Sequence, residues 1–138
     1  MKIIGIDFGD SRTGVAGSDA LGLMAHSIGV IFSKDLREVA KKVTECVSQT
    51  GAGKVVVGLP LNMDGTCGER VERTELFVAE LEKLINIPII MQDERLTTVS
   101  ATRVLNETNV RGQKRKQRID AVAATILLQG YLDREAVV

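Results

Sequence analysis

Short apolar runs separated by turn residues predict three strands in the first third of the chain. Ile3 to Phe8 is apolar on both faces of an extended chain apart from one acid, which predicts a buried strand. Gly9 to Gly14 holds turn residues and Val15 to Gly17 resumes an extended run, so the two runs predict a hairpin. Leu23 to Phe32 predicts a third strand. Three consecutive strands favour an antiparallel meander.

A helix and a buried strand are predicted next. Apolar residues from Leu36 to Val47 recur at helical spacing. Asp35 and Glu38 resemble a capping box at the start of this helix, and Gly51 is a typical helix end. Lys54 to Leu59 is a short apolar run that predicts a buried strand. The order strand, helix, strand makes it parallel to the first strand.

The middle of the chain predicts a second helix and a last strand. Thr66 followed by Glu69 is a capping-box signature for a helix that continues to Ile85. The loop before this helix, Pro60 to Gly68, can present backbone N–H groups to a phosphate or can be a plain loop with an N-cap, and both interpretations stay open. Ile87 to Gln92 predicts a short buried strand.

The C-terminal part predicts two helices separated by a polar segment. Thr97 or Thr98 can cap a helix that ends near Leu105. Asn106 to Gln117 is polar and predicts a loop. Arg118 to Leu132 is apolar almost all round, which predicts a helix packed on the sheet.

The order of these elements predicts an α/β fold. We expect a mixed five-stranded sheet flanked by helices, in which the first three strands are antiparallel and the first, fourth and fifth are parallel. The length of 138 residues, 44% of them hydrophobic, suits one domain over residues 1–138. Eighteen Lys and Arg balance eighteen Asp and Glu, so any nucleic-acid site must come from local clustering of charge.

Sulfur and imidazole side chains are few. Cys46, Cys67 and His26 suggest neither a disulfide framework nor a zinc site, and the histidine has no indicated partner for Ser/His/Asp or Cys/His catalysis. No apolar run is long enough to span a bilayer, and no basic leader precedes the first strand. We therefore expect a soluble cytoplasmic protein with reduced thiols.

Carboxylates occur where a parallel sheet commonly carries its chemistry. Asp7 lies within an apolar strand, where a charge is costly unless it is paired, hydrogen-bonded or bound to a metal. Asp93 and Glu94 follow the last strand, and Asp120 begins the last helix. Such acids, gathered at the carboxyl edge of the sheet, can hold Mg²⁺ or Mn²⁺. Structural alternatives stay open, since Asp7 can pair with Arg12 and Asp120 can favour the dipole of its helix.

A basic cluster precedes the last acid. No acidic residue interrupts the chain from Thr108 to Arg118, and the basic residues of this segment are Arg111, Lys114, Arg115, Lys116 and Arg118. A solvated loop and a nucleic-acid groove explain the run equally well.

Four blocks of the sequence carry a resemblance to a known family. They are GIDFGDSRTGVAGSD, VVVGLPLNMDGTCG, DERLTTVSATRVL and IDAVAATILLQGYL, and they resemble successive blocks of the bacterial YqgF family, also called RuvX. The resemblance covers nearly the whole chain. It implies a three-layer, ribonuclease H-like fold and a nuclease that matures the 5′ end of the 16S ribosomal RNA precursor. An older assignment of the family is Holliday junction resolution.

The resemblance also implies roles for particular residues. The acidic positions of the family fall on Asp7, Glu94 and Asp120, which would be catalytic and metal-binding, with Asp93 as an alternative ligand. The metal would be Mg²⁺ or Mn²⁺, with two ions bound together with the substrate. We expect the nucleic acid to be contacted by these basic residues: Arg12, Arg95, Arg111, Lys114, Arg115 and Lys116.

Two other classes of function stay open. The first residues also resemble the first phosphate loop of actin-like and sugar-kinase ATPases, which share the ribonuclease H-like core, so a nucleotide-binding module is one rival. A non-catalytic RNA-binding assembly factor is the other. We expect structured RNA as the substrate, with branched DNA as the alternative, and a monomer or a homodimer.

Overall fold

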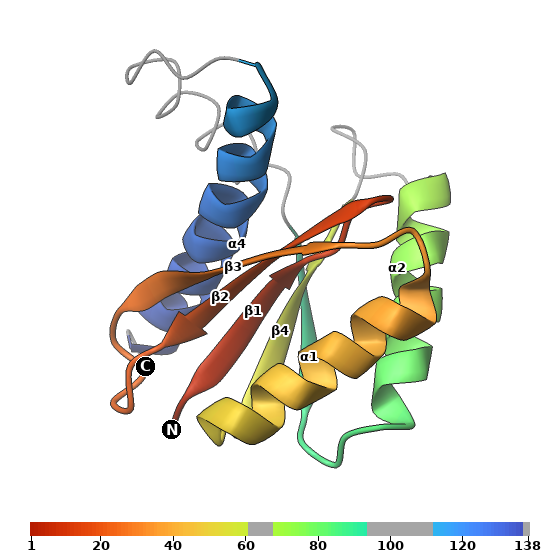
Figure 1. The fold of residues 1–138 in the computed structure, drawn as a ribbon. Coiled ribbons are helices and arrows are strands. Elements are labelled where there is room, and N and C mark those ends of the chain that lie inside the picture. The colour runs from red at the N-terminus through yellow and green to blue at the C-terminus, as the bar shows by residue number, and fades with distance from the viewer. Residues whose placement is uncertain (61–67, 94–111, 137–138) are drawn as a thin grey trace.

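The computed structural model describes residues 1–60, 68–93 and 112–136, and the side chains of all of these except 112–121 and 136. Within these ranges a five-stranded sheet has helices on both faces (Figure 1). The strands are β1 (Ile3–Asp7), β2 (Arg12–Ser18), β3 (Ala25–Phe32), β4 (Lys54–Leu59) and β5 (Ile89–Asp93). The helices are α1 (Leu36–Thr50), α2 (Glu69–Glu82) and α4 (Gly112–Ala136).

The strand order is β3-β2-β1-β4-β5, and it confirms the predicted mixed sheet. β1 pairs with β2, and β2 with β3, in antiparallel fashion, because short turns join these strands. β1 pairs with β4, and β4 with β5, in parallel fashion, because a helix connects each pair. The carboxyl ends of β1, β4 and β5 therefore meet at one edge of the sheet.

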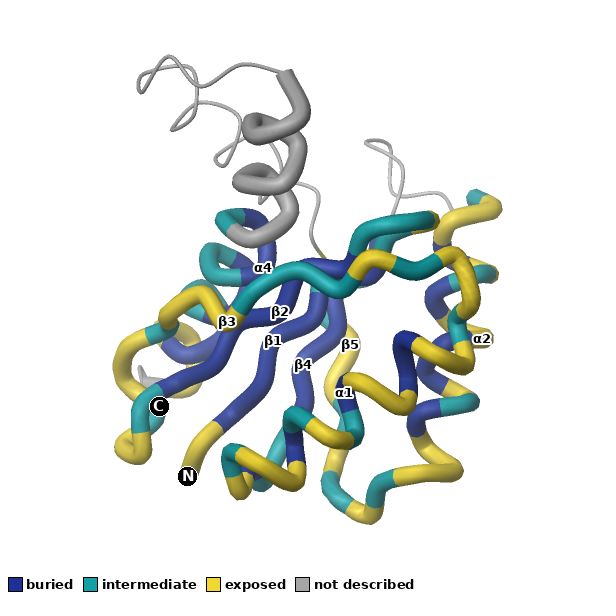
Figure 2. The backbone as a smooth tube through the Cα atoms, viewed as in Figure 1, coloured by how far each residue is buried: buried dark blue, intermediate teal, exposed yellow. Residues whose placement is uncertain are grey.

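Alternation along the strands divides the apolar residues between two layers. Ile4, Ile6 and Phe8 pack with α1 and α2 on one face of the sheet. Ile3 and Val56 pack with α4 on the other face. Helices thus cover both faces of β1 and β4, and most residues of these central strands are buried (Figure 2).

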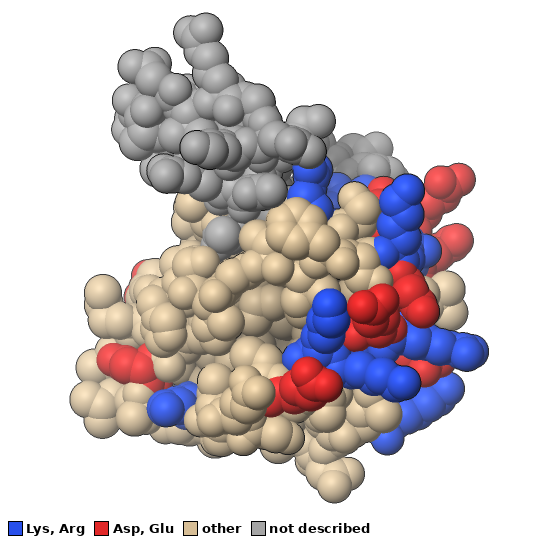
Figure 3. All heavy atoms as spheres, viewed as in Figure 1, with Lys and Arg blue, Asp and Glu red and all other residues tan. Residues whose placement is uncertain are grey.

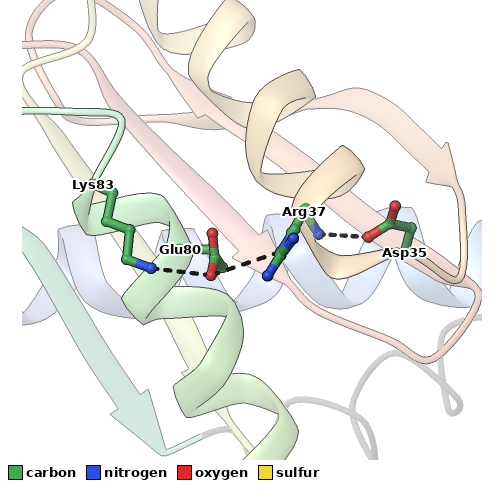
Figure 4. Close-up of polar contacts among 4 residues, drawn as sticks. All are labelled: Asp35, Arg37, Glu80 and Lys83. Carbon is green, nitrogen blue, oxygen red and sulfur yellow. Dashed lines mark hydrogen bonds and ion pairs between the residues drawn. The ribbon is translucent and has the colours of Figure 1, made fainter.

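The first helix, α1, begins and ends at the predicted residues. Asp35 is its N-cap and accepts a hydrogen bond from the backbone N–H of Arg37 (3.0 Å; Figure 4), and Gly51 ends it with a φ of 71°. The predicted capping box is wrong in its second half. The carboxylate of Glu38 accepts a hydrogen bond from the hydroxyl of Ser33 (2.9 Å), which in turn accepts one from the N–H of Asp35 (3.1 Å).

The second helix, α2, differs from the prediction at both ends. Its N-cap is Gly68 rather than Thr66, which lies outside the described residues. The helix ends at Glu82 instead of continuing to Ile85. The apolar repeat continues past Glu82 because a further turn follows the helix, in which the N–H of Ile85 donates to the carbonyl of Leu81 (3.1 Å).

Two strands begin later than predicted and are more exposed. β3 begins at Ala25 rather than Leu23, and β5 spans Ile89–Asp93 rather than Ile87 to Gln92. Both strands lie at the edges of the sheet, so each has a strand neighbour on one side only among the described residues. The prediction that β5 is a buried strand is therefore wrong, and Ile90 is 38% exposed.

The last helix, α4, is longer than predicted. It begins at Gly112 rather than Arg118, so the polar segment predicted as a loop is helical from residue 112 onward. Lys, Arg and Gln favour helices even though they produce no apolar repeat. The apolar face of α4 packs on the sheet, as predicted. The helix predicted from Thr97 or Thr98 to Leu105 lies outside the described residues.

Within the described ranges, no helix combines the length and the apolar character that crossing a membrane requires.

Candidate active site

Asp7 is the last residue of β1 and lies at the carboxyl edge of the sheet. It is half-buried, and its chain neighbours Ile6 and Phe8 are 0% and 4% exposed. By alternation Asp7 belongs with Ile3 and Gly5 to the face that α4 covers. The fold thus keeps this carboxylate at the rim of the core rather than inside it, which lowers the cost of its charge.

The next residue, Phe8, anchors this end of β1 on the opposite face. Its ring stacks on Phe77 of α2, with centroids 4.5 Å apart and ring planes at 9°. The guanidinium of Arg73 lies 5.8 Å from the centre of the Phe8 ring and donates to the carbonyl of Lys34 (2.8 Å). Arg73 also forms an ion pair with Asp10, with Nε 3.5 Å from Oδ1. These contacts hold the end of β1 and the turn after it in place.

Asp93 ends β5 at the same edge of the sheet but on the other face. It follows Gln92, whose side-chain amide donates to the carbonyl of Leu127 in α4 (3.2 Å). Asp93 is in phase with Ile89, which packs against the α1 and α2 layer. Asp93 and Asp7 therefore lie on opposite faces of the sheet.

The other predicted site residues are described in part or not at all. Three lie outside the described residues: Glu94, Arg95 and Arg111. Four lie on the helical backbone of α4 without a described side chain: Lys114, Arg115, Lys116 and Asp120. Among the side chains that the structure does describe, no three His, Cys, Asp or Glu gather as a metal site.

The backbone position of Asp120 overturns one of its two interpretations. Because α4 starts at Gly112, Asp120 lies beyond the first two turns of the helix. The favourable effect of a helix dipole on an acid fades within the first turn. The structural interpretation of Asp120 as a first-turn acid is therefore wrong.

The packing of α4 on β1 relates Asp120 to Asp7. A Cβ at Gly5 would lie 2.8 Å from Cβ of Leu128 and 3.4 Å from the carbonyl oxygen of Ala124, so the helix lies directly on the strand there. Asp7 is two residues further along β1, about 6.6 Å. Asp120 is four residues back along α4, about 6 Å. Since β1 and α4 run in opposite directions (Figure 1), both steps lead toward the same edge, and position 120 of the backbone comes level with Asp7.

A polar cavity of about 230 Å³ lies beside this edge, between the β1–β2 turn and the first turn of α2. It is lined by Gly9, Asp10, Ser11, Arg12 and Arg70. Arg12 is a predicted nucleic-acid contact, whereas Arg70 is a residue that the sequence analysis missed. It lies on the exposed side of a charged helix, and only the packing of α2 beside the turn brings it to Arg12.

Charged side chains are distributed unevenly over the molecule. Lys and Arg interleave with Asp and Glu over α1 and α2, whereas the visible surface around β3 carries few charges (Figure 3). Acidic and basic side chains therefore lie side by side on this part of the surface.

The cysteines and the histidine offer no catalytic nucleophile among the described residues. Cys46 lies in α1 as a free, half-buried thiol, and burial raises its pKa. His26 is exposed on β3. Cys67 lies outside the described residues.

The fold is that of a known class of proteins. The structure is similar to Thermus thermophilus RuvC in complex with a Holliday junction substrate, with a TM-score of 0.60, 15% identity and coverage of 98% of this chain and 96% of the other. It is also similar to the fowlpox virus Holliday junction resolvase, with a TM-score of 0.56, 13% identity and coverage of 97% and 99%. At such identities the likeness shows the fold alone, a RuvC-like ribonuclease H fold.

The sequence comparisons place the chain more narrowly. Residues 1–134 match the family described as "RuvX: Holliday junction resolvase". A Ruminiclostridium cellulolyticum protein named "putative pre-16S rRNA nuclease" is 46% identical, over 99% of this chain and 96% of the relative. An Oceanobacillus iheyensis protein of the same name is 44% identical, over 98% and 100%. The chain belongs to the RuvX family, also called YqgF, which confirms the resemblance found in its sequence.

Proposed function

We propose that this protein is a nuclease that hydrolyses phosphodiester bonds in the precursor of 16S ribosomal RNA. Relatives that match almost its full length carry this activity in their names. The RuvC-like ribonuclease H fold is the second support. The structural observation that carries the proposal is the place of Asp7, at the carboxyl edge of the sheet and level with position 120 of α4.

The proposed catalytic residues are Asp7, Glu94 and Asp120. β1 carries Asp7 to the edge, and the packing of α4 on β1 brings the backbone at Asp120 to the same level. Adjacent strand residues point to opposite faces, so Asp93 and Glu94 should not serve equally, and Asp93 lies on the face opposite Asp7. This alternation favours Glu94 over Asp93 as the third acid. Asp93, on the opposite face, suits the role of a structural cap.

The donor set fits a hard divalent cation. Carboxylate oxygens are the ligands that Mg²⁺ and Mn²⁺ prefer, and Asp7, Glu94 and Asp120 would hold the metal. Two such ions, bound together with the substrate, would supply an activated water and stabilise the leaving oxygen. Asp7 is suited to hold a ligand in a fixed direction, because its neighbours Ile6 and Phe8 are packed in the core.

Basic residues would bind the phosphates of the substrate. Three basic residues precede Asp120 on the backbone of α4, and we propose that they contact phosphates: Lys114, Arg115 and Lys116. The remaining proposed contacts are Arg12, Arg95 and Arg111. Phosphate contacts serve RNA and DNA alike, so the choice of RNA rests on the names of the relatives, and a four-way DNA junction is the alternative. A monomer or a homodimer stays a prediction.

The test is a cleavage assay with wild-type protein and Asp7→Asn. Each is incubated with a 16S ribosomal RNA precursor transcript and with a synthetic four-way DNA junction, in Mg²⁺, Mn²⁺ or EDTA. We expect cleavage of the RNA in the presence of metal, and a loss of at least about a hundredfold in Asp7→Asn, because a catalytic group is removed.

Asp93→Asn is the matched control, since it makes the same chemical change at the same edge on the opposite face. It should keep its rate within about threefold, as expected for a group outside the reacting centre. Cleavage that survives EDTA or Asp7→Asn would contradict the proposal. Hydrolysis of ATP without nuclease activity would favour the nucleotide-binding module, and RNA binding without any cleavage would favour the assembly factor.

A further inference from the structure

The polar cavity between the β1–β2 turn and α2 has the composition of an anion site. We propose that it binds one backbone phosphate of the nucleic-acid chain, next to the phosphate that is cleaved. This inference rests on the proposed nuclease function and adds a substrate-positioning residue to it, Arg70. The cavity has a volume of about 230 Å³ and is lined by residues 9–12 of the β1–β2 turn and by Arg70 of α2.

The turn that forms one wall is rigidly built. A Cβ at Gly9 would lie 2.1 Å from the carbonyl oxygen of Arg12, so only glycine allows the chain to close there. The N–H of Ser33 donates to the carbonyl of Ser11 (3.0 Å) and ties the turn to the end of β3. Because this wall is already ordered, a ligand binds there with little loss of conformational entropy.

The charges at the cavity favour an anion. Arg12 and Arg70 reach it from two different elements, and a guanidinium can bind a phosphate through two parallel hydrogen bonds. Asp10 is the acidic residue among those that line the cavity, and Arg73 lies 3.5 Å from its carboxylate and offsets its charge. Arg73 is in turn held over the ring of Phe8, so this compensation is part of the fold.

The start of α2 adds to this effect. Its N-cap is Gly68, which has no side chain to cap the first N–H groups of the helix. The positive end of the helix dipole therefore lies beside Arg70, and the acidic side chains of the same turn, Glu69 and Glu72, offset part of it.

The place and lining of the cavity point to a phosphate within a chain rather than to a free nucleotide. Gly9 is two residues beyond Asp7, so their Cα atoms are at most about 7.6 Å apart. None of the lining residues, Gly9, Asp10, Ser11, Arg12 and Arg70, is aromatic, so the cavity lacks the aromatic platform on which a base commonly stacks.

The test measures RNA binding by proteins that also carry Asp7→Asn, so that no cleavage interferes. Arg12→Gln and Arg70→Gln should each weaken binding of a single-stranded RNA fragment about five- to tenfold and reduce the slope of log K against log salt. The double variant, which loses the one phosphate contact, should reduce that slope by about 0.7 in all. The double variant should lose less than the product of the two single losses, because both residues contact one phosphate. An unchanged affinity and slope in Arg70→Gln would overturn the proposal, and so would fully independent losses.

Arg37→Gln is the matched control, because it removes the same charge from the same face. The guanidinium of Arg37 lies 3.9 Å from Glu80 (Figure 4), which is ten residues or about 15 Å further along α2 than Arg70. It should leave the affinity for RNA within twofold. An equal loss in Arg37→Gln would show a general effect of surface charge and overturn the proposal.

A titration with inorganic phosphate separates this inference from the nuclease function. In wild-type protein, phosphate should shift the amide NMR signals of Gly9, Ser11 and Arg70, and the shifts should disappear in the Arg12→Gln, Arg70→Gln double variant. Shifts without any RNA cleavage would reject the nuclease function but keep the anion site. Cleavage without the shifts and without the binding losses would reject the anion site alone. ATP that binds more tightly than the RNA fragment would overturn the assignment to a polynucleotide.

Discussion

On the face of the sheet under α1 and α2, β1 presents large side chains, whereas on the face under α4 it presents a glycine at the point of contact. On the first face Ile4, Ile6 and Phe8 of β1 meet the aromatic ring of Phe77 and the aliphatic side chains around it. On the second face β1 presents Gly5, and its neighbours there include alanines from β2 and α4.

This difference indicates that the two faces of the sheet have different roles, one in stability and one in the geometry of the site. Burial of apolar side chains removes apolar surface from water, so we expect the α1 and α2 layer, the larger of the two described clusters, to contribute more to stability. Small residues let a helix approach a strand closely, since the separation of packed elements depends on the side chains between them. The α4 face therefore determines where Asp120 lies relative to Asp7, and small changes there should affect activity more than stability.

Phe77→Ala should have the largest effect and should act on stability. It leaves a cavity in the larger core layer and removes the stacking with Phe8, so we expect a loss of about 3 to 5 kcal/mol in the free energy of unfolding. Urea denaturation measures this loss. Leu76→Ala is the control, because Leu76 is the adjacent residue and is 60% exposed. A cost below about 1 kcal/mol for Phe77→Ala would show that this face does not dominate stability.

Gly5→Ala should have the next largest effect and should act on activity. Its methyl group would lie 2.8 Å from Cβ of Leu128, so α4 must move away from β1, at a cost of about 1 to 3 kcal/mol for overpacking. We expect RNA cleavage, measured where the variant is fully folded, to decrease by about a hundredfold, because a displacement near 1 Å at a catalytic group has that effect.

Gly17→Ala is the matched control for Gly5→Ala. Its methyl group would also approach a neighbour to 2.8 Å, but that neighbour is the end of the flexible side chain of Ile28, which is 44% exposed and free to turn aside. Gly17→Ala should keep its cleavage rate within about threefold. Equal losses of activity in both variants would contradict the special role of the α4 face.

Tyr131→Phe should have the smallest effect. It removes the hydroxyl that accepts a hydrogen bond from Nζ of Lys54 (2.7 Å) but keeps the ring, whose centre lies 5.2 Å from the same nitrogen. The free energy of unfolding should decrease by about 0.5 to 1.5 kcal/mol, with cleavage unchanged, because this contact lies where β4 begins, at the end of the sheet away from Asp7. Thermal denaturation and the cleavage assay together check both parts, and a loss of activity would show that the whole length of α4 influences the site.

Much of the fold follows from local patterns in the sequence. The apolar runs of β1 and β4 and the helical repeat between Asp35 and Gly51 predict those elements, because each depends on residues close together in the chain. The strand directions follow as well, since short turns impose antiparallel pairing and helical connections impose parallel pairing. For the same reason the sequence indicates Asp7, an acid inside an apolar strand, as a candidate for chemistry.

The tertiary structure decided which of these features come together. No apolar repeat marks the start of α4 at Gly112. The sequence alone therefore allowed Asp120 to lie in the first turn of the helix. Asp93 and Asp7 lie on opposite faces of the sheet because of the registers in which β5 pairs with β4 and β4 pairs with β1. These registers align residues that are far apart in the chain. The cavity of Arg12 and Arg70 likewise exists only because α2 packs beside the β1–β2 turn. Local sequence determines the elements, whereas contacts across the chain determine the site, because side chains of distant segments become neighbours only when the layers pack.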